Sequence, residues 1–151
     1  MTAVEQNDLV REATAAVQAC ADEFDARATS LLEHLPQLPI EERLRAAVMS
    51  LCAGLKDTSG RVMFELSLLQ AQLDERKADA GSAVRSLSRM DGALMEALAP
   101  VADLIDKLEA DAERDEQNER AFVLVIEASG VMLQSLDKAR TATQALQAEL
   151  R

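Results

Sequence analysis

Apolar side chains recur every three or four residues along almost the whole chain, and this spacing constrains the fold more than any other feature. Val10, Val17 and Phe24 share one helical face, with acidic residues between them. A repeat of this length is typical of amphipathic α-helices, whereas a half-buried β-strand would alternate with a period of two. The pattern predicts an all-α protein.

Breaks in the pattern divide the chain into four predicted helices. Pro36 and Pro39 remove two backbone donors and end the first helix. Further along, we expect Gly81 to adopt a positive φ and Ser82 to cap the helix that follows. The predicted helices cover residues 2–35, 40–79, 82–114 and 117–150.

Two irregular points fall inside predicted helices. The polar stretch from Lys56 to Gly60 weakens the second helix, but the apolar stripe continues through it, so we predict one long helix with a possible kink near Gly60. The stripe of the third helix passes through Pro100 without a shift in register. This continuity favours a kinked helix over a loop.

Short connections between long helices are typical of antiparallel neighbours. We therefore predict that residues 1–151 form a single domain, an elongated antiparallel four-helix bundle with coiled-coil-like packing. Helical hairpins exchanged between two chains of a homodimer remain an alternative. The narrow apolar seams, with only three Phe and no Trp or Tyr, make homodimerisation plausible.

The chain is strongly acidic, with 16 Lys and Arg against 27 Asp and Glu and a formal net charge of −11. Binding to nucleic acid or to an anionic membrane surface depends on clustered basic residues, so neither is expected. The longest apolar run, residues 121–126, is far shorter than a membrane span. The N-terminus contains Glu5 and Asp8 and does not resemble a signal peptide, so we expect a cytoplasmic protein.

No group of residues predicts catalysis or ligand binding. His34 is the single histidine and lies at a predicted helix end, where its ring can meet free carbonyl groups. Cys20 and Cys52 are too few for a disulfide framework or a structural zinc site and are expected to be buried. We expect no metal, no cofactor and no enzymatic activity.

One short segment, Asp57-Thr58-Ser59-Gly60-Arg61-Val62, is similar to a helix of the chemotaxis response-regulator phosphatases of the long-hairpin type. In that family, an acidic residue and a glutamine one turn later act on an aspartyl phosphate. The resemblance would give Asp57 the acidic role, but Arg61 stands where the glutamine is expected. A signalling phosphatase centred on Asp57 is the weakest of the functional hypotheses.

The strongest binding signal lies where an acidic run meets an apolar patch. Residues 103–119 contain eight acidic and two basic side chains, and an entirely apolar hexapeptide, residues 121–126, follows after Arg120. An acidic rim beside an apolar surface is typical of sites that bind an amphipathic helix. The candidate contact residues are Phe122, Val123, Val125 and Ile126 in the patch and Asp111, Glu113, Asp115, Glu116 and Glu119 in the acidic run.

These observations predict a non-enzymatic helical module that binds an amphipathic or basic partner protein. Its role would be that of an adaptor, a secretion-type chaperone or an assembly subunit. The alternative is an acidic immunity or inhibitor protein that neutralises a basic toxin or nuclease through charge complementarity.

Overall fold

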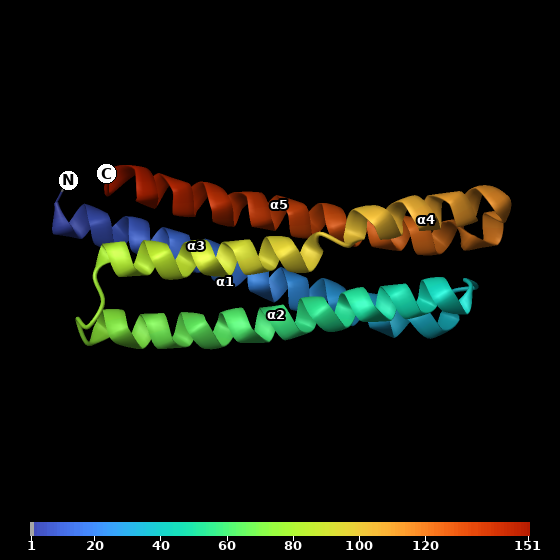
Figure 1. The fold of residues 1–151 in the computed structure, drawn as a ribbon, viewed down its shortest axis with the longest axis horizontal. Coiled ribbons are helices and arrows are strands. Elements are labelled where there is room, and N and C mark those ends of the chain that lie inside the picture. Colours follow the sequence, from blue (N-terminus) through green and yellow to red (C-terminus); the bar gives the residue numbers. More distant parts are fainter. Residues whose placement is uncertain (1) are drawn as a thin grey trace.

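The computed structural model describes residues 2–151 and arranges them as four antiparallel helical rods (Figure 1). Within these residues there is no β-strand, which confirms the predicted all-α four-helix bundle. The third rod is divided into two helices, α3 and α4, and two short 3₁₀ turns occupy connections. The elements are α1 (Ala3–His34), η1 (Leu35–Gln37), α2 (Glu42–Asp74), α3 (Ala80–Leu98), α4 (Val101–Arg114), η2 (Glu116–Asn118) and α5 (Glu119–Glu149).

Each helix packs against the rods next to it in the chain, and α1 also packs along α5 to close the bundle. Helices α1 and α3 touch across the centre, whereas α2 and α5 lie on opposite sides, as Figure 1 shows. The outer faces of α2 and α5 therefore point away from each other.

The core is a thin seam of aliphatic side chains that runs the length of the bundle. Phe24 is its single fully buried aromatic residue, and Leu55, Leu87 and Leu108 are also completely buried. Several alanines on α1, α3 and α5 are fully buried as well, and their small side chains allow neighbouring helices to approach closely.

The loop between α1 and α2 is held by one arginine. The guanidinium group of Arg45 donates hydrogen bonds to the backbone carbonyls of Leu35 and Leu38, the second at 2.8 Å. Both carbonyl groups belong to the connection after α1 and also accept backbone hydrogen bonds, from the amides of Leu38 and Ile40, so Arg45 ties this connection to α2. His34, the last residue of α1, has its Nδ1 atom 2.7 Å from the carbonyl oxygen of Ser30, one turn back in the same helix.

The turn between α2 and α3 differs from the prediction. Helix α2 ends at Asp74, and the chain reverses through Arg76, which adopts a φ of 57°. The capping residue is Asp79, whose carboxylate accepts a hydrogen bond from the Ser82 amide at 2.8 Å. This bond lowers the pKa of Asp79. Gly81 lies inside α3 without a positive φ, so the predicted roles of Gly81 and Ser82 were wrong.

Pro100 lies at the junction where the third rod is divided into α3 and α4. Ala99 and Pro100 keep helical dihedral angles between α3 and α4, and buried Leu98 and Val101 continue the apolar stripe across the junction. Beyond this junction, α4 follows α5 and packs only lightly on α2 (Figure 1). The two rods α2 and α4 therefore separate at this end of the bundle.

Helix α2 continues unbroken through Gly60, as the apolar stripe predicted. Its polar stretch is stabilised from α1: the Ser59 hydroxyl donates to the Ala21 carbonyl at 2.7 Å, and the Lys56 ammonium binds Asp25 and Thr29. Tertiary contacts here offset the low helix propensity of the sequence.

Two methionines on α3 provide a matched test of this core. Met90 is buried, whereas Met95 is 43% exposed. We expect Met90→Ala to lower the free energy of unfolding by about 2–5 kcal/mol, because it leaves a cavity, and Met95→Ala to change it by less than about 0.5 kcal/mol. Urea denaturation followed by circular dichroism measures both, and equal effects would contradict the packing described.

Candidate protein-binding site

The apolar patch that the sequence singled out is divided between the core and the surface. Ala121 and Val125 are buried, and Phe122 is half-buried against the core. Val123 and Ile126 are 39% and 40% exposed on the outer side of α5. Val125 is therefore a core residue, and of the candidate contact residues in the patch Val123 and Ile126 are the exposed ones.

The exposed part of the patch continues further along α5 than predicted. Val123, Ile126, Gly130 and Leu133 follow one another at steps of three and four residues and share one outer face, which we call the α5 stripe. Leu133 is 51% exposed and extends the stripe beyond the apolar hexapeptide. A Cβ atom added to Gly130 would meet nothing within 4 Å, so the middle of the stripe is open.

The acidic run forms the end of the bundle beside the α5 stripe. Glu113, Asp115, Glu116 and Glu119 are exposed around the turn from α4 to α5, whereas Asp111 is half-buried. Asp115 also has a structural role, because its carboxylate accepts a hydrogen bond from the Gln117 amide at 3.0 Å. The structure thus brings the acidic side chains to the same end of α5 as Val123 and Ile126.

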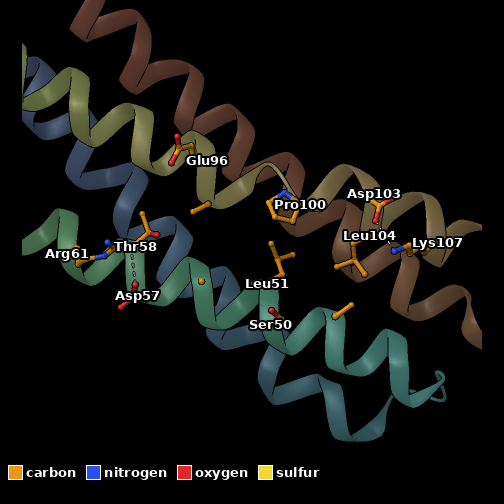
Figure 2. Close-up of a pocket in the computed structure, with 13 residues that line it drawn as sticks. Ser50, Leu51, Asp57, Thr58, Arg61, Glu96, Pro100, Asp103, Leu104 and Lys107 are labelled. Atoms are coloured by element: carbon orange, nitrogen blue, oxygen red, sulfur yellow. Dashed lines mark ion pairs between the residues drawn. The ribbon is translucent and has the colours of Figure 1, made fainter.

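A groove of about 410 Å³ lies on another side of the molecule, between α2 and the kink at Pro100 (Figure 2). Its wall on α2 includes Gly54, Asp57 and Arg61, and Asp103 and Lys107 lie on α4. Sequence reasoning did not find this groove, because it arises from the separation of α4 from α2.

Asp57 and Arg61, the two residues of the phosphatase hypothesis, both line this groove. Arg61 binds the carboxylate of Asp57 at 3.0 Å, as the dashed line in Figure 2 shows, and both side chains are largely exposed. His34 lies in a separate hollow between α1 and α5. The phosphatase interpretation remains a hypothesis that rests on the sequence resemblance alone.

A single carboxylate is partly buried between α3 and α5. Asp91 Oδ2 lies 3.7 Å from Nε of Arg140, while Oδ1 is buried without a hydrogen-bond partner. Burial raises the pKa of Asp91, and the positive charge of Arg140 offsets part of this effect. Along α3, the core position between Leu87 and Leu94 is occupied by Met90 rather than by Asp91.

Both cysteines are free and buried, as expected. Burial, together with the negative charges of Asp91 and Glu23, raises the pKa of Cys20 to about 12. Burial also raises the pKa of Cys52 to about 11, despite an opposing effect from Lys56. The two thiols are therefore protonated near neutral pH and poorly nucleophilic.

Residues 2–151 contain no cluster of three or more His, Cys, Asp or Glu side chains able to hold a metal ion. In the same part of the chain, no helix combines the length and apolar character needed to cross a membrane. Comparison with protein-family models, curated proteins and solved structures gave no match. Functional inference therefore rests on the surfaces of this molecule.

The buried thiols predict a simple chemical result. In the native protein, we expect an aromatic disulfide reagent to label neither cysteine at pH 7 on the timescale of minutes, because both thiols are protonated and covered. In strong denaturant, Cys20 and Cys52 should both react rapidly. Absorbance of the released thiolate counts the labelled groups, and rapid labelling of the native chain would contradict this burial.

Asp91 predicts a pH-dependent change in stability. We expect Asp91→Leu to raise the free energy of unfolding by about 1–2 kcal/mol at neutral pH, because it removes a poorly solvated carboxylate while Arg140 retains access to water. The folded-state pKa of Asp91 is raised, so the native carboxylate is protonated before the unfolded one as the pH falls.

The difference in free energy of unfolding between Asp91→Leu and the natural chain should therefore shrink as the pH falls through the raised pKa of Asp91. Urea denaturation between about pH 4 and about pH 7 measures this change, because that interval lies above the ordinary Asp pKa of about 3.9. Asp106→Leu, at an exposed position on α4, is the control and should show no such dependence. A constant difference for Asp91→Leu would exclude the proposed protonation.

Proposed function

We propose that this protein is a non-catalytic helical module that binds a basic amphipathic helix of a partner protein on the α5 stripe. The observation that carries the proposal is the row of exposed apolar residues Val123, Ile126 and Leu133 beside the acidic end of the bundle. An adaptor, a secretion-type chaperone or an assembly subunit would use such a surface.

The α5 stripe has the spacing that a docked helix requires. Its residues follow the steps of three and four that place apolar side chains along one line of a helix, and Gly130 leaves room for a second backbone to approach. Burying three aliphatic side chains from this face would provide about 25 cal/mol for each Å² removed from water.

The acidic residues would determine which helices bind. Glu113, Glu116 and Glu119 are exposed at the end of α5 where the apolar stripe begins. A partner helix with Lys or Arg at that end would be attracted, and the attraction would mainly raise the association rate. An acidic partner would be repelled by the net charge of −11.

A synthetic helix with Leu along one face and Lys along the other is a suitable probe. We expect Ile126→Asp to weaken its binding on the order of tenfold or more, because the change places a charge in the middle of the apolar contact. Met95→Asp, at a similarly exposed position on α3, is the matched control and should bind normally. Isothermal titration calorimetry measures binding, and circular dichroism checks the fold.

The same probe separates the contribution of the apolar α5 stripe from that of the acidic residues. In stopped-flow measurements, Glu113→Ser combined with Glu116→Ser should slow association and leave dissociation nearly unchanged. If Ile126→Asp binds normally and high salt abolishes binding, the acidic surface acts alone, as the inhibitor hypothesis requires. Normal binding by both variants would overturn the proposed site.

A further inference from the structure

The outer face of α2 is unusually poor in charge for so acidic a chain. Exposed residues from Ala46 to Ala71 include the large apolar side chains of Met49, Phe64 and Leu68. The exposed charged residues in this interval are Asp57 and Arg61, which neutralise each other in an ion pair. Lys56 and Glu65 are partly buried.

One line of residues on this face runs from Ala47 to Ala71. Its first half lies in a hollow, and its second half protrudes from the surface. The residues recur at alternating steps of three and four, the spacing of a coiled-coil seam. The first half forms a wall of the groove beside Pro100, with small side chains at Ala47, Ser50 and Gly54. The second half carries Phe64, which is 66% exposed, and Leu68.

The two halves fit each other when α2 of a second copy packs antiparallel against α2 of this chain. Gly54 and Phe64 are each five residues from position 59, and Ser50 and Leu68 are each nine residues from it. A two-fold axis at the level of Ser59 therefore places each large side chain beside a small one of the other copy. Asp57 and Arg61, two residues on either side, meet at the centre with opposite charges.

The charge of this α2 face also suits a second copy. Its two exposed charged side chains between Ala46 and Ala71 have opposite signs. Two such faces therefore meet without net repulsion between them, although the molecule as a whole is strongly acidic.

Gly54 keeps the middle of the hollow half open. A Cβ atom added to Gly54 would meet nothing within 4 Å, so no neighbour in the same chain fills this space. A large side chain of a second copy can therefore approach the α2 backbone closely at this position.

We propose that the protein forms a two-fold symmetric dimer in which α2 packs antiparallel against α2 of a second copy. Phe64 of each copy enters the groove at Gly54 of the other, and the Asp57–Arg61 pairs of both copies form a central layer of alternating charge. The contact runs from Ala47 to Ala71, about 36 Å of helix. It leaves both α5 stripes exposed, because α2 and α5 lie on opposite sides of the bundle.

Sedimentation equilibrium over a range of protein concentrations tests the dimer. The natural chain should sediment with twice the mass of one chain, and Phe64→Asp should raise the dimer dissociation constant on the order of a hundredfold. Leu133→Asp, at an exposed position on α5, is the control and should remain dimeric. Circular dichroism verifies that each variant is folded.

A charge exchange tests the register. Asp57→Arg places four positive charges at the centre of the homodimer, and Arg61→Asp places four negative charges there, so each variant alone should be monomeric. An equimolar mixture should recover the dimer mass, because the positive centre of one variant then faces the negative centre of the other.

A natural chain that stays monomeric, or a Phe64→Asp variant that stays dimeric, would overturn the proposed interface. Failure of the mixture of Asp57→Arg and Arg61→Asp to dimerise would overturn the proposed register. Neither result bears on the α5 stripe, whose test uses a separate peptide and separate variants.

Discussion

The structure depends on burial of a narrow apolar seam along the whole length of the rods. Isolated helices of this size are marginal in water, so tertiary packing must supply most of their stability. With Phe24 the single fully buried aromatic residue, close packing of small and aliphatic side chains takes the place of bulk. Fully buried alanines such as Ala13 and Ala139 bring the backbones together. The polar side chains in the seam are small, and hydroxyls such as that of Thr143 donate to a backbone carbonyl.

Pro100 affects both the packing of the third rod and the shape of the surface beside it. An interior proline costs a helix about 3 kcal/mol, yet the apolar register is maintained across the kink by Leu98 and Val101. The change in direction keeps α4 on α5 and draws it away from α2, which opens the groove beside Gly54. A single local constraint thus creates the hollow that the proposed dimer fills.

The two proposed contact surfaces lie on diagonal helices and are compatible with each other. Dimerisation through α2 would leave an α5 stripe on each outer side, so one dimer would present two equivalent sites for a partner helix. A partner with two suitable helices would then gain avidity, provided that its linker spans the dimer. Their chemistry differs, since the α5 stripe lies beside an acidic rim and the α2 face is neutral.

The apolar period was sufficient to predict the fold class, the continuity of α2 through Gly60 and the continuity of the buried stripe across Pro100, because helix formation and seam burial are governed by residue spacing. The apolar period could not decide which apolar residues in the first half of α5 face the core. Val125 proved to be core and Leu133 surface, since this depends on where α1 and α4 contact α5. The α2–α3 turn through Arg76 and the groove at Gly54 likewise arise from the way the rods meet, which no local pattern encodes.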